Sequence, residues 1–138
     1  LLNDYTFKDV PEHAHDNRWL HRPKMDWALV KKPNPTVENL LAGTKHIIKA
    51  RKATPHLASN VATKIIDTQN EKLFAFIRTA DEGNLIAIFN FTDEWTNISA
   101  ELLRANGITD FKDALGGGEI TPTKNQIAIA PYGRLWLT

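Results

Sequence analysis

Residues 36–53 carry the clearest periodic pattern of hydrophobic and polar positions in the chain. Apolar side chains recur there at the three-, four- and seven-residue intervals that line one face of an α-helix. Thr36 is suited to cap the start of this helix, and Pro55 ends it because proline cannot continue a helix. The predicted helix therefore covers residues 37–53, and its apolar stripe must rest on another surface. The stripe comprises Val37, Leu40, Leu41, Thr44, Ile47, Ile48 and Arg51.

From about residue 60 the pattern changes to short apolar runs separated by turn-forming residues. Two runs, 72–79 and 84–91, are joined by Ala80-Asp81-Glu82-Gly83, a linker typical of a β-hairpin. Shorter candidate strands lie at 94–100, 119–121, 126–130 and 134–137, and the glycines at 116–118 predict a connection between strands. Short strands at this spacing indicate an antiparallel sandwich or barrel.

Residues 1–35 show no stable period and hold three of the five histidines. Imidazole and carboxylate groups can ligate metals, and four such residues are grouped here. Their spacing matches no specific zinc pattern, so surface or hydrogen-bonding histidines are the favoured interpretation. The group comprises His13, His15, Asp16 and His21. The other two histidines, His46 on the helix and His56 after its end, are predicted to be structural.

Length and charge narrow the class of protein. A complete (β/α)₈ barrel needs about 250 residues. A chain of 138 residues can therefore hold one core, and only a piece of such a barrel. Seventeen Lys and Arg residues are interspersed with sixteen Asp and Glu residues, for a net charge of +1, which gives no support to nucleic-acid binding. No apolar run approaches the ~18 residues that span a membrane.

The chain has no cysteine, which excludes disulfide scaffolds, thiolate zinc sites and cysteine nucleophiles. Together with the lack of a visible signal sequence, this favours a cytoplasmic location, although it fixes no compartment. The chain opens on Leu1-Leu2 without an initiator methionine. We therefore expect it to have been cut from something longer.

Acidic and aromatic side chains are the remaining candidates for chemistry. Glycoside cleavage uses two facing carboxyl groups, and five carboxylates crowd the first segment, but their spacing does not separate an acid from a nucleophile. They are Asp4, Asp9, Glu12, Asp16 and Asp26. Tryptophans at 19, 27, 95 and 136 can stack on sugar rings. Trp19, beside Arg18 in an irregular stretch, is the better ligand candidate, whereas Trp136 alternates within a strand pattern and is predicted to be buried.

Four stretches together resemble the C-terminal part of the α-amylase superfamily, glycoside hydrolase family 13, and in particular its amylosucrase and sucrose-hydrolase branch. The first, Leu2-Asn3-Asp4-Tyr5, is similar to the loop after the eighth barrel strand, and the second, Asp16-Asn17-Arg18-Trp19-Leu20-His21-Arg22-Pro23, is similar to a motif of that branch. The third, residues 47–57, is similar to the final barrel helix. The fourth is a set of runs similar to strands of the C-terminal sandwich, at 73–78, 86–91, 113–117 and 131–137. The order of these motifs makes the resemblance specific.

The resemblance implies a mainly β fold with one long helix. A C-terminal antiparallel Greek-key β-sandwich would be preceded by the last loop and helix of a truncated (β/α)₈ barrel. Residues 1–58 would be the remnant of the catalytic barrel, with its helix at about 37–53, and residues 59–138 would be the sandwich domain.

The same resemblance implies a retaining enzyme acting on α-glucosides, either a sucrose glucosyltransferase or a sucrose hydrolase. Its nucleophilic Asp, acid/base Glu and stabilising Asp would all precede residue 1, so we expect no catalytic residue in this chain, no cofactor and no metal. Arg18 corresponds to a sugar-contacting arginine, with Asp16 and Trp19 as weaker candidates for substrate binding. Sucrose or α-glucan and the missing barrel would be the partners. A stand-alone carbohydrate-binding module and a protein-interaction module are the alternatives.

Overall fold

Antiparallel β-structure and one long helix make up most of the described chain. The computed structural model describes residues 27–28 and 34–138, and the chain divides into two units, Leu1–Gly43 and Thr44–Thr138. Helix α2 covers Pro35–Ala53 and is followed by the single 3₁₀ turn η3, Pro55–Leu57. The predicted mainly β fold with one long helix is confirmed.

Helix α2 starts two residues earlier than the sequence predicts, and Thr36 is not its cap. The side-chain oxygen Oδ1 of Asn34 accepts hydrogen bonds from the backbone N–H groups of Thr36, at 3.0 Å, and Val37, at 3.4 Å. Pro35 is the first helical residue, a position where its missing N–H costs nothing because no helical partner exists for it. The helix ends at Ala53, as expected from Pro55, and the Thr54 hydroxyl donates to the Ala50 carbonyl at 2.8 Å.

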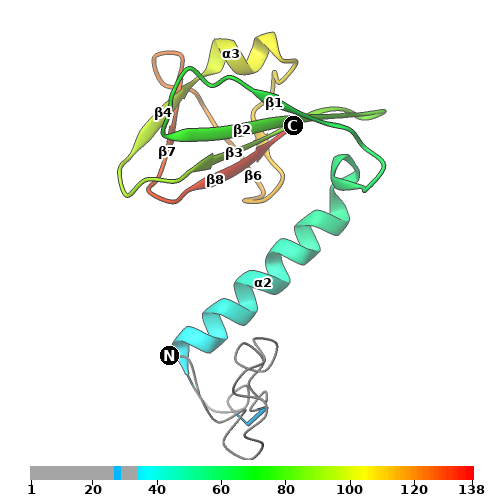
Figure 1. Ribbon diagram of the computed structural model, residues 1–138, viewed down its shortest axis with the longest axis vertical. Helices are drawn as coiled ribbons and strands as arrows, with labels where there is room; N and C mark the ends of the chain where they lie inside the picture. Colours follow the sequence, from blue (N-terminus) through cyan, green and yellow to red (C-terminus); the bar gives the residue numbers. More distant parts are fainter. Residues whose placement is uncertain (1–26, 29–33) are drawn as a thin grey trace, which may run out of the picture. The chain divides into compact units, whose positions relative to one another are not determined.

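The strands form one sheet of six and one of two, all pairs antiparallel (Figure 1). The order in the larger sheet is β1-β2-β3-β8-β5-β6, and the smaller sheet pairs β4 with β7. The chain leaves the larger sheet after β3 to form β4, returns to it for β5 and β6, and leaves it again for β7. It ends in β8, which lies between β3 and β5 in the larger sheet. The strands are β1 Thr63–Ile66, β2 Leu73–Ala80, β3 Gly83–Asn90, β4 Thr96–Ser99, β5 Lys112–Asp113, β6 Gly118–Glu119, β7 Gln126–Ile129 and β8 Arg134–Leu137.

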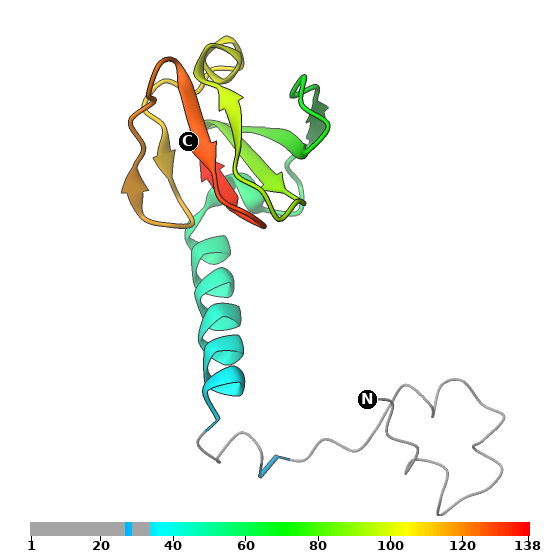
Figure 2. The ribbon, with the colours of Figure 1, turned by 90° about the vertical axis from the view of Figure 1, so that its left-hand side faces the viewer.

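The candidate strand at 94–100 is too long at both ends, because β4 begins only at Thr96. Strand β4 stops at Ser99, and a helix that the sequence did not predict, α3, covers Ala100–Ala105 (Figure 2). The Ser99 hydroxyl caps this helix by accepting a hydrogen bond from the Leu102 N–H at 3.4 Å. A serine can continue a strand pattern and can also cap a helix, so the sequence alone does not predict the boundary between β4 and α3.

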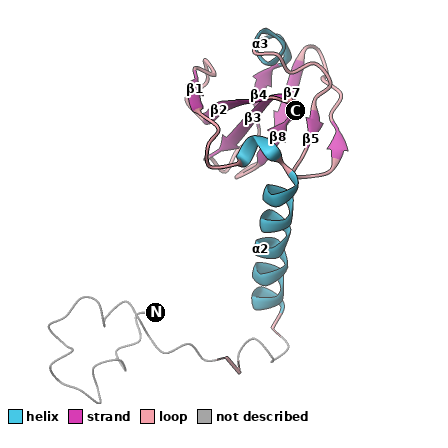
Figure 3. Cartoon of the chain, turned by 90° about the vertical axis from the view of Figure 1, so that its right-hand side faces the viewer, coloured by secondary structure: helices cyan, strands magenta, loops and turns pink. Residues whose placement is uncertain are grey.

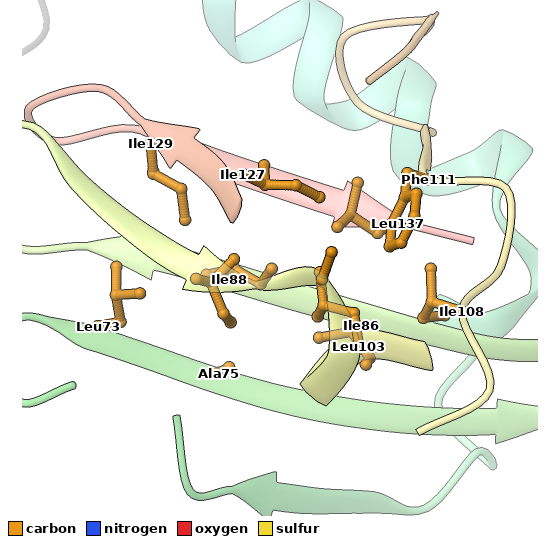
Figure 4. Close-up of a cluster of buried hydrophobic side chains, with 12 residues drawn as sticks. Leu73, Ala75, Ile86, Ile88, Leu103, Ile108, Phe111, Ile127, Ile129 and Leu137 are labelled. Carbon is orange, nitrogen blue, oxygen red and sulfur yellow. The ribbon is translucent and has the colours of Figure 1, made fainter. Parts of the chain in front are cut away.

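The hydrophobic core lies between the two sheets. Side chains from β2 and β3 point toward β7, as Figure 4 shows for Ile88 and Ile127, and α3 adds Leu103. Figure 3 shows the strands of the smaller sheet, β4 and β7, with the strands of the larger one. In both sheets successive side chains point to opposite faces, so each sheet has a second face directed away from this core. The buried core residues are Leu73, Ala75, Ile86, Ile88, Ile98, Ala100, Leu103, Ile108, Phe111, Ile127, Ile129 and Leu137.

One buried asparagine joins the two sheets at one end of the sandwich. Asn90, the last residue of β3, is 3% exposed. Its side-chain nitrogen Nδ2 donates to the carbonyl oxygens of Glu94, at 2.7 Å, and Ala130, at 2.9 Å. Its oxygen Oδ1 accepts from the Thr92 N–H at 3.0 Å. Asn90 therefore fixes both the turn that leaves the larger sheet and the end of β7.

Candidate functional site

The three residues that the sequence predicts to bind substrate, Asp16, Arg18 and Trp19, lie outside the described residues. The possible metal-ligating group at residues 13–21 lies outside them as well. Within 27–28 and 34–138, no three residues of the His, Asp and Glu types are grouped closely enough to hold a metal ion. None of the helices in these ranges is long and apolar enough to cross a membrane. Among the described residues, candidate binding sites are therefore sought on the surfaces of the sandwich and of α2.

Polar contacts join the second half of α2 and the segment after η3 to the larger sheet and its turns. The ring nitrogen Nε2 of His46 lies 2.8 Å from the Leu115 carbonyl oxygen. The Arg78 guanidinium, on β2, donates to the carbonyl oxygens of Ala58, at 2.7 Å, and Val61. His56 is 6% exposed, and neither of its ring nitrogens has a hydrogen-bond partner in the described part of the chain. Structural roles for these two histidines stay a prediction.

The apolar stripe of α2 remains largely open. Leu41 is 40% exposed, Ile47 40% and Ile48 51%, while Ala50 is the buried residue of the helix. Close to the helix end, Ile48, Pro55 and Leu57 border a shallow pocket of 410 Å³. Large apolar side chains on a helix normally face a core, and exposed ones that gather in patches mark interaction surfaces. The stripe has the composition of a surface that packs against other structure.

The outer face of the larger sheet is unusually aromatic. Phe74 and Phe76 of β2 alternate with core residues and point away from the core, and Phe74 lies opposite Phe89 of β3 in the register. Phe91 follows the end of β3 and is 69% exposed. We call Phe74, Phe76, Phe89 and Phe91 the aromatic face.

Phe89 is the centre of the aromatic face. The centroid of its ring lies 6.3 Å from that of Phe74, 6.1 Å from that of Phe76 and 6.3 Å from that of Phe91. Offset and tilted pairs at such distances attract one another beyond the area they bury. Further along the same side of the sheet, Leu85 lies opposite Arg78 and is fully buried. The segment after α2, held there by Arg78, thus covers one end of this face and leaves the aromatic end open.

The smaller sheet presents a different outer surface, which is hollowed and polar. The connection between β1 and β2 lies beside β4 and β7, and together they border a groove of 620 Å³. We call this the polar groove. Its lining residues are Thr68, Gln69, Asn70, Glu71, Lys72, Asn97, Ser99 and Gln126.

Hydrogen bonds hold the walls of the polar groove together. The Asn70 side chain donates to the Thr96 hydroxyl at 2.8 Å and to the Asn97 carbonyl at 3.1 Å, and it accepts from the Lys72 N–H at 3.1 Å. The Thr68 hydroxyl donates to the Asn70 carbonyl at 2.8 Å. The loop is therefore pinned to β4 before any ligand arrives.

One residue of the groove lining, Lys72, belongs to an ion pair. The Lys72 ammonium contacts the Glu94 carboxylate, and this hydrogen bond and charge raise the pKa of Lys72 and lower the pKa of Glu94. Both groups are exposed to solvent, where such pairs stabilise a fold only slightly. The pair therefore serves mainly to hold the segment of Glu94 and Trp95 beside the loop that lines the groove.

Comparison with known families assigns the sandwich. The family model for the amylosucrase C-terminal domain matches residues 64–138, which is more than half of the chain. The chain belongs to this family. The resemblance seen in the motifs of the sequence, to the C-terminal part of a glycoside hydrolase family 13 enzyme of the amylosucrase branch, is thereby confirmed.

Two solved structures share the fold of this chain. The crystal structure of AmyP in complex with maltose matches 75% of this chain at 22% sequence identity, with a TM-score of 0.61. An AmyP variant in complex with maltotriose matches the same share at 23% identity, with a TM-score of 0.60. In both cases this amylosucrase-type chain spans only 21% of the AmyP chain.

The sequence predicts Trp95, which lies beside the polar groove, as a candidate for sugar binding, but it does not predict the groove itself. Trp95 was a candidate for stacking on sugar, and it is 68% exposed. Trp136, predicted to be buried, is half-buried. Asn97 and Gln126 carried no signal of their own, because only the pairing of β4 with β7, in which Ser99 lies opposite Gln126, brings them together. The alternation of exposed and buried residues in β4 is the signal that would have marked Asn97 as a surface position.

Proposed function

We propose that this chain is the C-terminal part of a retaining enzyme that acts on α-glucosides, either a sucrose glucosyltransferase or a sucrose hydrolase. In this proposal residues 59–138 form a Greek-key sandwich that stabilises a (β/α)₈ barrel, and residues 1–58 contribute the last loop and helix of that barrel. The observation that carries the proposal is the match of residues 64–138 to the amylosucrase C-terminal domain.

The two open apolar surfaces support this role for the sandwich. The aromatic face and the stripe of α2 leave large side chains in solvent, among them Phe91 at 69% and Ile48 at 51% exposure. Burying apolar surface yields about 25 cal/mol per Å², so both surfaces gain stability when another part of a protein covers them. A barrel is the partner of matching chemistry, since the last helix of such a barrel packs its apolar stripe on the barrel strands, and the surrounding ring of helices offers a folded surface for the aromatic face.

Substrate binding would come from the segment before α2. Barrel enzymes place their active sites at the C-terminal face, where the loop after the last strand borders the pocket. Arg18 would contact sugar hydroxyls there through its planar, permanently charged guanidinium, with Asp16 and Trp19 as neighbours. The nucleophile and the acid/base would come from barrel strands that precede this segment. The chain alone would therefore hold only part of the substrate-binding site and would catalyse no step of the reaction.

Two measurements test this function. The purified 138-residue chain should release no glucose from sucrose, as measured with a coupled glucose assay. The coding sequence upstream of Leu1 should encode barrel strands that carry the Asp, Glu and Asp of the retaining mechanism. Glucose release by the isolated chain would show that the catalytic groups lie within it, and an upstream sequence without these carboxylates would exclude the enzyme altogether.

A further inference from the structure

The polar groove offers several amide groups that are not used inside the protein. Asn97 and Gln126 are both exposed, and their side chains make no hydrogen bond within the described part of the chain. The side chain of Gln69, on the opposite wall, is in the same condition. Each amide presents both a donor and an acceptor, which is the combination that recognises a hydroxyl group.

A tryptophan lies next to these amides on the same side of β4. Thr96 and Ile98 are buried, at 7% and 2% exposure, so the residues that alternate with them, Trp95 and Asn97, face outward. Trp95 is 68% exposed although it is the largest apolar side chain in this part of the sandwich. An exposed, rigid indole beside convergent polar groups is the composition of a ligand-binding surface.

The charges around the groove favour an uncharged ligand. Lys72 pairs with Glu94, and Glu71, the other charged residue of the lining, makes no ion pair within the described part of the chain. A carboxylate disfavours a phosphate or an acidic polymer, and it accepts hydrogen bonds from sugar hydroxyls. Because Asn70 already pins the loop to β4, a ligand would meet a formed surface and lose little affinity to ordering it.

We infer that the polar groove together with Trp95 binds a neutral oligosaccharide, namely an α-1,4-linked glucan chain. One glucose ring stacks on the Trp95 indole, and hydroxyl groups of the chain exchange hydrogen bonds with the amides of Asn97 and Gln126. Sugar binding by this surface does not require the missing barrel. The choice of an α-linked glucan rests on the proposed function, because an enzyme that acts on α-glucosides meets such chains as substrate or product.

Calorimetric titration of the 138-residue chain with maltoheptaose tests the inference, with cellohexaose as the β-linked comparison. We expect millimolar binding of maltoheptaose by the natural chain, and a loss of about tenfold or more in Trp95→Ala, since aromatic anchors carry most of the affinity of such contacts. The double variant Asn97→Ala/Gln126→Ala should weaken binding severalfold. Circular dichroism would verify that each variant keeps its fold, as expected for changes at exposed positions.

Phe91→Ala is the matched control, because Phe91 is an equally exposed aromatic residue, at 69% against 68% for Trp95, on the other sheet. It should leave maltoheptaose binding unchanged. Absence of binding to either sugar would overturn the inference, as would binding that Trp95→Ala leaves intact. Binding of cellohexaose alone would overturn the choice of ligand. None of these outcomes bears on the carboxylates upstream of Leu1, so failure here and failure of the proposed enzyme can be told apart.

Discussion

The two outer faces of the sandwich differ in chemistry although they belong to one small domain. The aromatic face of the larger sheet carries three phenylalanines around Phe89, whereas the smaller sheet carries amides, hydroxyls and one exposed tryptophan around its groove. An apolar surface gains most from contact with another folded surface, and a polar groove gains most from a ligand with many hydroxyl groups. The comparison suggests that one face of the domain is for support and the other for recognition.

The strand patterns explain how one fold supports both faces. In β3, Leu85, Ile86, Ala87 and Ile88 are consecutive and fully buried, because the core lies on one side and other residues of the chain cover the other. In β7 the burial simply alternates, with Ile127 and Ile129 inward and exposed residues between them. A strand with a continuous apolar run is typical of burial on both faces, and an alternating strand is typical of one solvated face.

The largest change in the free energy of unfolding is expected at a buried residue that joins the two sheets, compared with a residue on one of the outer faces. Asn90→Ala should lower the free energy of unfolding by about 2–4 kcal/mol, because the carbonyl oxygens of Glu94 and Ala130 lose the donor that the buried Asn90 side chain supplies. The matched variant Asn97→Ala, at an exposed position, should change it by less than about 0.5 kcal/mol. Urea unfolding of both variants measures this difference. Equal losses would mean that the groove is part of the structural framework rather than a separate surface.

A smaller effect should distinguish positions within the aromatic face. Phe89→Ala should lower the free energy of unfolding by about 1–3 kcal/mol, since this half-buried ring contacts three others. Phe91→Ala should cost less than about 0.5 kcal/mol, because most of that ring is already in water. Thermal unfolding followed by circular dichroism would rank them. Equal costs would show that the aromatic face is internally packed, and would weaken its interpretation as a docking surface.

The sequence predicted the apolar parts of the molecule better than the polar ones. The predicted bounds of β8 equal the observed ones, and those of β2 and β3 differ from them by one residue at each end. These strands can be predicted because an apolar run flanked by turn residues is visible in the local sequence. The start of α2 was misplaced because Asn34 and Thr36 are both good caps, and only the position of Pro35 decides between them. The polar groove could not be predicted, since residues 68–72 reach β4 only through the side chain of Asn70, and Gln126 reaches it only through the pairing of β4 with β7.

The smallest effect concerns the charge pair that borders the polar groove, for which the aromatic face has no counterpart. The lowered pKa of Glu94 means that its carboxylate adds stability above its ordinary pKa of 4.5, and that this contribution is lost as the pH falls through the lowered value. The raised pKa of Lys72 adds stability below 10.5, which is lost as the pH rises through the raised value. Between these limits the natural chain should unfold at a slightly higher urea concentration than Glu94→Gln.

The difference should vanish in acid and in high salt, because the pair is exposed and screened. Glu119→Gln, a change at an exposed carboxylate on β6 that makes no ion pair within the described residues, is the control and should leave the urea midpoint nearly unchanged. A difference between Glu94→Gln and the natural chain that persists in acid would mean that Glu94 acts through something other than its charge. If maltoheptaose binding also weakens in Glu94→Gln while the fold is kept, the ion pair positions Trp95 for its ligand, and recognition by this face depends on a contact that contributes little to stability.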